Sequence, residues 1–171
     1  VILLLIAACS SNKSVKVEAP PPPSPLQLAH AYADSGATAF TAEDYLSAIK
    51  YFSKSREYYE EAAPTASPTD SIEVNIERMD LNIALSYVNQ GNEDASLGLY
   101  DDALTAYQNA ANIYQSLKPL TITPAERDDY LDKLYRNMAI TAQNAKKFEQ
   151  ALQYYDMVLT YEPGNEEILN I

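Results

Sequence analysis

One pattern of apolar residues occurs three times in this chain, and it constrains the fold more than any other feature. Each copy places an aromatic residue, an alanine, a large aliphatic residue and a second aromatic residue at positions i, i+3, i+4 and i+7, which share one face of an α-helix. The second copy follows the first by 55 residues, and the third follows the second by 48. The copies are Tyr45, Ala48, Ile49 and Phe52, then Tyr100, Ala103, Leu104 and Tyr107, then Phe148, Ala151, Leu152 and Tyr155.

The same two offsets relate three tyrosines that lie upstream of these copies, Tyr32, Tyr87 and Tyr135. From residue 26 onward apolar residues recur at helical spacing, without the alternation of a β-strand. An alanine at a helix crossing lets two backbones approach to about 8 Å, and a neighbouring aromatic ring fills the space beside it. The sequence therefore predicts an all-α fold in which each unit is an antiparallel pair of helices, six helices in total.

The third unit carries the most specific set of residues. Residues 135–139 read YRNMA, and they are followed by Phe148, the Ala-Leu pair at 151–152, Tyr155 and Pro163. This set resembles the tetratricopeptide repeat. The resemblance implies a tetratricopeptide-like α-solenoid of about three antiparallel helical hairpins over residues 26–165, and a role in binding proteins. Residues 166–171 would then begin a truncated cap or the next repeat.

The first two hairpins are predicted to be longer than the standard repeat of about 34 residues. Gly36 and Gly91 are interpreted as the turns that end the first helices. Tyr45 and Tyr100 follow these glycines by nine residues, which is seven more than the family pattern leads us to expect. Seven residues make two helical turns, so the added length keeps the apolar face in register. We expect extended helices at these places.

Helix boundaries are marked by residues that cap helices. Ser24 and Thr123 each precede a proline, and Glu126 lies three residues after Thr123, as in a capping box. Proline-containing segments at 64–70 and 119–123 are predicted to separate the units. Acidic pairs are predicted in first turns, where they complement the helix dipole; the pairs are Glu43-Asp44, Asp101-Asp102 and Asp128-Asp129.

The N-terminal residues indicate an export signal. Residues 1–8 are apolar and end in Ala-Ala directly before Cys9. As a helix they would reach only about 12 Å, which is too short to span a hydrocarbon core of about 30 Å. An apolar segment that ends in small residues is typical of a secretory signal. With cysteine next, it resembles the lipobox of bacterial lipoproteins, which implies a signal-peptide remnant at 1–8 and lipid attached to Cys9. The alternative is an ordinary hydrophobic N-terminus with a buried cysteine.

Residues 9–25 are predicted to join the lipidated cysteine to the helical domain. They are polar and then proline-rich, ending APPPPSP. Such a segment favours polyproline II at about 3.1 Å per residue and acts as a spacer of up to about 50 Å; a ligand for a proline-binding module is the alternative. Ser10 after the cysteine, by resemblance to the known sorting rule, favours the periplasmic face of the outer membrane. Without an outer membrane, the extracytoplasmic face of the plasma membrane is expected.

The charge excludes two classes of binding partner. The chain has 24 acidic and 12 basic residues, for a net charge of −12. A nucleic-acid-binding protein would carry a basic stripe, and adhesion to anionic lipid would need basic clusters. We therefore expect no nucleic-acid partner, and membrane contact only through the lipid on Cys9.

Few residues could support catalysis or metal binding. The chain has one cysteine and one histidine, His30, which cannot build the usual zinc site or a Cys-His pair. His30 is predicted to be packed or solvent-facing. Residues 92–98 superficially resemble a calcium loop, but Leu97 and Ala103 occupy the positions that need glycine and glutamate. No catalytic residue, metal, cofactor or small-molecule substrate is predicted.

The resemblance places the binding surface on the concave side of the array, along the first helices of the hairpins. The candidate residues are Arg78, Leu81, Leu85 and Asn89 in the second unit and Lys133, Arg136, Ile140 and Gln143 in the third. We call these eight residues the candidate strip. It is basic and apolar, so the hypothesis is that it accepts an acidic or C-terminal peptide with an apolar anchor; the alternative is a solvated surface without a ligand. Tyr58 and Tyr154 are expected to point outward as possible anchors.

The predicted function is that of a membrane-anchored scaffold or adaptor for other proteins of a cell-envelope complex. One alternative is a cell-wall-acting enzyme, or a regulator of one, whose active site is not visible in the sequence. Another is a purely architectural subunit that uses its convex side.

Overall fold

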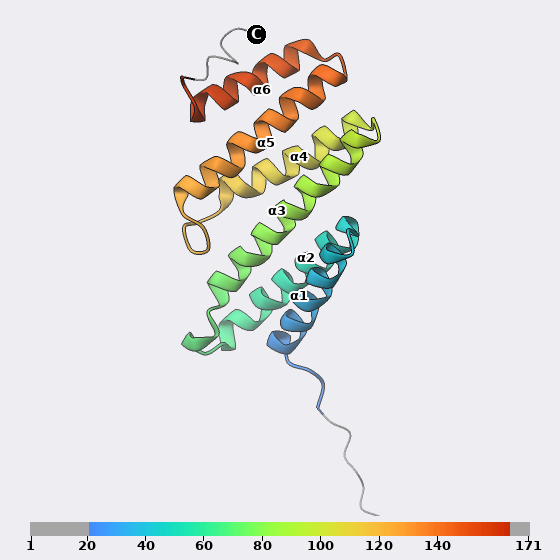
Figure 1. Cartoon of the computed structure of the whole chain (residues 1–171). Coiled ribbons are helices and arrows are strands. Elements are labelled where there is room, and N and C mark those ends of the chain that lie inside the picture. The colour runs from blue at the N-terminus through green and yellow to red at the C-terminus, as the bar shows by residue number, and fades with distance from the viewer. Residues whose placement is uncertain (1–20, 165–171) are drawn as a thin grey trace, which may run out of the picture.

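A computed structural model of the protein describes residues 21–164, and this part of the chain is all-helical, with no strand (Figure 1). The all-α prediction is therefore confirmed. The α-helices are α1 (Pro25–Thr41), α2 (Tyr45–Ala62), α3 (Ile72–Ser96), α4 (Tyr100–Ser116), α5 (Pro124–Asn144) and α6 (Phe148–Tyr161). Two short 3₁₀ turns, η1 (Ala63–Thr65) and η2 (Pro68–Asp70), lie in the connection between α2 and α3.

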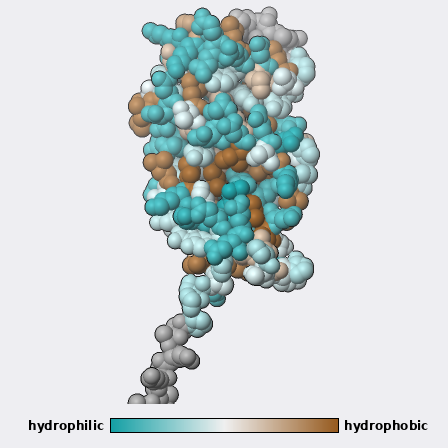
Figure 2. Space-filling view, turned by 180° about the vertical axis from the view of Figure 1, so that it is seen from behind, coloured by the Kyte–Doolittle hydropathy of each residue, from teal (hydrophilic) through white to brown (hydrophobic). Residues whose placement is uncertain are grey.

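Helices that follow one another in sequence pack against one another. The most extensive contacts join α1 to α2, α3 to α4 and α5 to α6, while α2–α3 and α4–α5 join neighbouring pairs. Figure 1 shows the three pairs arranged in chain order from one end of the molecule to the other. In the face seen in Figure 2, apolar residues gather in several separate patches among hydrophilic ones.

The turn inside each pair has the same geometry. A left-handed residue occurs at Glu43 (φ 61°), Gly98 (φ 77°) and Lys146 (φ 60°), and these positions are separated by the same 55 and 48 residues as the apolar copies. The residue after each one donates its backbone N–H to the helix carbonyl five residues earlier, as in a Schellman motif. These bonds run from Asp44 to Ala39, from Leu99 to Asp94 and from Lys147 to Ala142.

As predicted, α1 and α3 continue as helices beyond Gly36 and Gly91. The prediction that this extension distinguishes the first two pairs is wrong, because the third pair has it too. Three residues separate the helices of every pair, and the third pair has the same nine-residue spacing, from Ala139 to Phe148, as the first two. The helices of the first pair, with 17 and 18 residues, together match those of the third, with 21 and 14. Only the second pair is longer, because α3 has 25 residues.

Gly36 and Gly91 lie inside α1 and α3 rather than in turns, which corrects their interpretation as helix-ending residues. A Cβ atom at Gly36 would lie 2.6 Å from the ring of Phe52, and one at Gly91 would lie 2.6 Å from the ring of Tyr107. Such distances are too short for a side chain, so glycine is required because an aromatic ring of the second helix rests on the backbone of the first.

The buried apolar residues form two clusters, one among α1, α2 and α3 and the other among α3, α4, α5 and α6. Tyr87 and Ile113 pack against both. The three alanines predicted at the helix crossings are buried, and tyrosine supplies several of the bulky core groups; these residues are Ala48, Ala103, Ala151, Tyr59, Tyr107, Tyr114 and Tyr135.

The predicted caps of α1 and α5 are confirmed, because Ser24 and Thr123 each form a capping box. The acidic pairs are only partly where they were predicted. Asp44 is the N-cap of α2, and the second pair lies in the first turn of α4. The third pair, Asp128-Asp129, lies beyond the first turn of α5, in which Glu126 is the acidic residue.

The remaining predictions concern the end of α6, the calcium loop, a membrane span and the residues outside the described part. Helix α6 ends at Tyr161, shortly before Pro163. Residues 92–96 belong to α3, so they do not form a calcium loop. Within residues 21–164, no helix combines the length and apolarity that crossing a membrane requires. The predicted signal remnant, Cys9 and the segment 166–171 lie outside the described residues.

Candidate functional site

The candidate strip divides between two first helices. Arg78, Leu81, Leu85 and Asn89 belong to α3, and Lys133, Arg136, Ile140 and Gln143 belong to α5. The two helices lie close enough for the Asn137 amide to donate a 3.3 Å hydrogen bond to Asn92 Oδ1. The two groups of four are not equivalent positions, however. Of the eight, only Leu85 and Lys133 are related by the 48-residue offset.

The cations of the strip on α5 already have acidic partners. Lys133 Nζ lies 2.7 Å from Asp129 Oδ2, and this hydrogen bond raises the pKa of Lys133. Arg136 contacts Asp132 at 2.9 Å and Glu162 at 2.6 Å. The α5 half of the strip is therefore nearly neutral, although its residue types look basic.

Arg136 balances the charge of a buried acid. Asp132, its partner on the same helix, is buried, and Asp132 Oδ1 has no hydrogen-bond partner among the described residues. The position 48 residues earlier is Ala84, which is fully buried. An acid has therefore replaced a core alanine, and a buried carboxylate is strongly destabilising unless a cation accompanies it. Arg136 supplies that cation.

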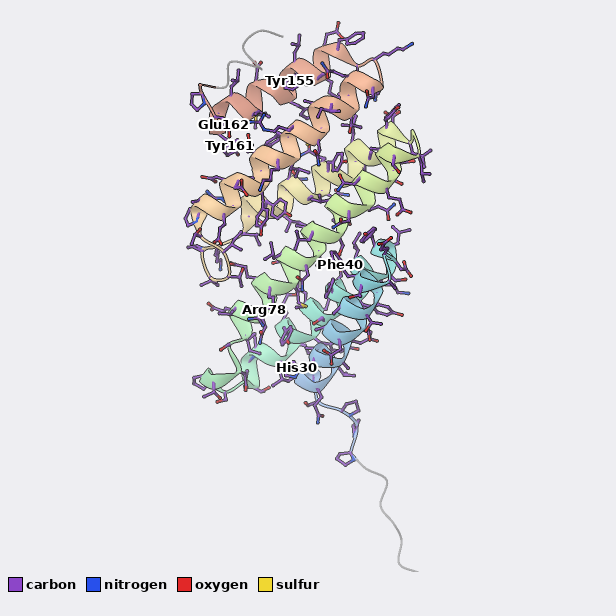
Figure 3. The ribbon with its side chains drawn as sticks, viewed as in Figure 1. His30, Phe40, Arg78, Tyr155, Tyr161 and Glu162 are labelled. Carbon is purple, nitrogen blue, oxygen red and sulfur yellow. The ribbon has the colours of Figure 1, made fainter. Side chains whose placement is uncertain are left out.

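Arg78 is exposed and, unlike the other two cations, forms no salt bridge within residues 21–164. Its guanidinium donates a 2.8 Å hydrogen bond to the neutral side chain of Asn75. Burial raises the pKa of Tyr59, and the charge of Arg78 opposes that rise while Asp34 adds to it. His30 of α1 meets the Tyr59 ring of α2 edge-on, with ring centroids 5.7 Å apart. Figure 3 shows Arg78 on α3 and His30 on α1.

The uncharged members of the strip are not equally available. Leu81 packs against the second core cluster, and Gln143 accepts a hydrogen bond from the Tyr155 hydroxyl. Asn89 donates to the backbone carbonyl of Leu85. Leu85 itself is half-buried, and Ile140 is among the exposed large apolar residues. The exposed members of the strip are therefore Arg78, Lys133 and Ile140, and Leu85 is half-buried like Leu81.

Glu77 is a buried residue that sequence reasoning missed. Its carboxylate accepts hydrogen bonds from the backbone N–H groups of Lys118, Leu120 and Thr121 at 2.8, 3.0 and 2.8 Å. It also accepts one from the Thr121 hydroxyl at 2.9 Å. Glu77 thus ties the α4–α5 connection to α3, and we call this set of bonds the Glu77 latch. No local pattern could have revealed it, because the partners lie more than 40 residues away.

The charges beside this latch pair with one another. An open pocket of about 400 Å³ lies between α2, α3 and the α4–α5 connection. On its wall Arg56 contacts Asp80 at 2.7 Å and Glu60 at 3.2 Å. Burial raises the pKa of Asp80, and Arg56 partly offsets that rise. Among residues 21–164, no group of three or more His, Cys, Asp or Glu side chains could hold a metal ion.

The two tyrosines expected to point outward are half-buried. Tyr58 stacks on Tyr32 with ring centroids 5.4 Å apart, and the Tyr154 hydroxyl accepts a hydrogen bond from Gln150. Both side chains are thus held by contacts within their own pair, so neither is the free anchor that was predicted.

Comparison with known proteins adds no relative to this description. The resemblance to the tetratricopeptide family therefore remains an expectation that rests on the residues of the chain itself. The sequence matches no protein-family model, and no curated protein matches it.

Proposed function

We propose that this protein is a tetratricopeptide-like α-solenoid that binds other proteins of the cell envelope and is tethered there through lipid on Cys9. The support for a solenoid is the identical turn in all three pairs, together with contacts that run from each helix to the next. An array of this kind presents an extended surface rather than an enclosed active site. A scaffold or adaptor role follows from that surface.

The observation that carries the proposal is the exposed Arg78 beside apolar side chains. Its closest polar partner, Asn75, is uncharged, so the cation remains available to a carboxylate. Leu81 and Leu85 lie three and seven residues further along the same helix, where a ligand crossing α3 would meet them. The ligand that suits this combination is a peptide with a carboxylate and a large apolar residue.

Peptide binding can be tested with one labelled peptide that ends in an apolar residue and a free carboxylate, and with the same peptide amidated. Fluorescence anisotropy with the whole chain should show weaker binding of the amidated form. Arg78→Ala should weaken binding by about fivefold, which corresponds to about 1 kcal/mol for an exposed charge. Arg136→Ala should weaken it less, because that side chain already serves Asp132.

The control is Lys50→Ala, which removes an exposed cation from α2, outside the strip. Unchanged affinity in the Arg78→Ala/Arg136→Ala double variant would refute peptide binding by the strip.

The tether is tested separately. Cells that express the protein with its export signal are labelled with radioactive palmitate, and the label should disappear in Cys9→Ser. Label that persists in this variant would contradict attachment at Cys9, and it would leave the peptide-binding result unaffected.

A further inference from the structure

Helix α6 carries an apolar stripe that is partly exposed, whereas three of the four equivalent residues of α4 are buried. We define the α6 stripe as Phe148, Leu152, Tyr155 and Leu159, which lie at i, i+4, i+7 and i+11 and so share one face. The equivalent residues of α4, 48 positions earlier, are Tyr100, Leu104, Tyr107 and Ala111.

Exposure separates the two stripes. Leu104 is 6% exposed, whereas Leu152 is 53% exposed, and Phe148 is 59% exposed. Tyr107 and Ala111 are buried, while Leu159 is only half-buried. Leucine is thus inside the protein at the second position of the stripe in α4 and at its surface in α6, while Tyr100 and Tyr155 are both half-buried.

The difference arises because α5 covers α4. Tyr130 of α5 stacks on Tyr114 with ring centroids 5.3 Å apart. Near the other end of α4, burial raises the pKa of Tyr107, and a hydrogen bond with Thr141 of α5 opposes that rise. Helix α6 lies at one end of the described molecule, and its one extensive contact there is with α5 (Figure 1). The described residues therefore leave Phe148 and Leu152 of the α6 stripe at the surface.

The charges beside the α6 stripe are acidic. Glu149 and Asp156 are exposed and lie next to it, one residue after Phe148 and four residues after Leu152. Two cations precede the stripe: Lys147 is paired with Asp101 of α4 at 2.5 Å, and Lys146 is exposed in the turn before α6. A second copy of this protein, with a net charge of −12, would bring more negative charge to this edge.

We propose that the α6 stripe binds a basic amphipathic α-helix of a partner protein, which packs on α6 as α5 packs on α4. Apolar residues of the partner at helical spacing fill the place beside Leu152, and its flanking Lys or Arg residues meet Glu149 and Asp156. This surface is separate from the candidate strip on α3 and α5, so the two binding activities can be lost independently.

The test uses the whole chain and two synthetic 18-residue helical peptides. Both have leucines at i, i+4, i+7 and i+11; one has lysines beside them, and the other has glutamates there. Fluorescence anisotropy should show binding of the lysine peptide and about tenfold weaker binding of the glutamate peptide. Leu152→Glu should weaken binding of the lysine peptide by at least about tenfold.

The matched control is Leu46→Glu, which changes another exposed leucine, on α2, and should leave binding unchanged. Circular dichroism checks that both variants remain folded, and Arg78→Ala should also bind the lysine peptide normally. Three outcomes would overturn the proposal: no binding of the lysine peptide, equal binding of the two peptides, or equal loss in the two leucine variants. A dimer in sedimentation equilibrium that Leu152→Glu dissociates would also overturn it, because the occupant would then be a second copy.

Discussion

The two junctions between helix pairs are built differently. At the first, α2 and α3 share an apolar cluster to which Met79 and Ile83 of α3 contribute, with the Arg56–Asp80 ion pair beside it. At the second, α4 and α5 meet through stacked tyrosines, and the connection between them is held to α3 by the Glu77 latch. Similar repeats are thus joined by apolar packing in one place and partly by a buried carboxylate in the other.

The residue pattern that pairs two helices and the contacts that join one pair to the next are therefore separate requirements of the fold. The pattern of alanines, glycines and aromatic rings brings two helices of one pair together. It does not determine how one pair meets the next, because the connections between pairs differ in length and structure. Changes at the two junctions should therefore have different consequences.

The largest effect is expected for Glu77→Ala. Three backbone N–H groups would lose their acceptor, and leaving such donors unsatisfied costs about 1–3 kcal/mol each, so we expect a total loss of about 3 kcal/mol in the free energy of unfolding. Guanidinium denaturation measures this loss, and hydrogen exchange should show faster exchange in α5 and α6 than in α1 and α2. Glu73→Ala, an exposed acid one turn away, should change stability by less than about 0.5 kcal/mol. Uniformly faster exchange would argue against a separate second junction.

The next largest effect compares Leu104→Ala with Leu152→Ala. Leu104 is buried in the second core cluster, so its truncation should cost about 2–3 kcal/mol in the free energy of unfolding. Leu152 occupies the equivalent position without a covering helix in the described structure, and its truncation should cost less than about 0.5 kcal/mol. Thermal and denaturant unfolding of both variants provide the measurement. Equal losses would mean that the α6 stripe is covered in solution.

Alkaline pH should affect both junctions through buried tyrosines. Burial raises the pKa of Tyr114 at the second junction and of Tyr59 at the first. A raised pKa in the folded state means that their contribution to stability is fully present below the unfolded value of about 10 and is lost as the pH rises further. Tyr114→Phe should therefore flatten the fall in stability above pH 10 more than Tyr59→Phe does, with unfolding measured at several pH values. An unchanged slope in Tyr114→Phe would show that its hydroxyl stays solvated.

The smallest effect concerns the turns inside the pairs. Unlike the junctions, these three turns share one geometry, so each should respond to glycine in the same way. Glu43 and Lys146 have the left-handed conformation that glycine adopts without cost, and Gly98 already occupies the equivalent position. Glu43→Gly and Lys146→Gly should each stabilise the protein by about 0.5–1 kcal/mol, and Gly98→Ala should destabilise it by about 1 kcal/mol. Melting temperatures would detect these changes. Opposite signs for the first two variants would show that the turns differ in solution.

The sequence was sufficient for the helices and their pairing, because these depend on local signals. Capping boxes at Ser24 and Thr123 marked helix starts, and the buried alanines marked the crossings. The turns were misplaced because Gly36 and Gly91 looked like turn residues. These two glycines instead allow the two helices of a pair to approach closely, while Glu43 and Lys146 occupy the left-handed turn positions.

The candidate site was less predictable, because its charge depends on neighbours. The acids that pair with Lys133 and Arg136 lie four residues earlier on the same helix, so their i,i+4 spacing was a usable signal. The contact of Arg136 with Glu162 and the Glu77 latch join distant parts of the chain, and no local pattern predicts them.

The Glu77 latch limits how this array could be lengthened by engineering. A duplicate of residues 100–147 inserted after Lys147 would add one 48-residue period, and both of its ends would lie at the turn that recurs inside each pair. The new connection between pairs would lack a carboxylate, because the residue 48 positions after Glu77 is Ala125. A longer protein should therefore be more stable with Ala125→Glu in addition to the duplication, because this side chain would supply the missing acceptor at the new connection.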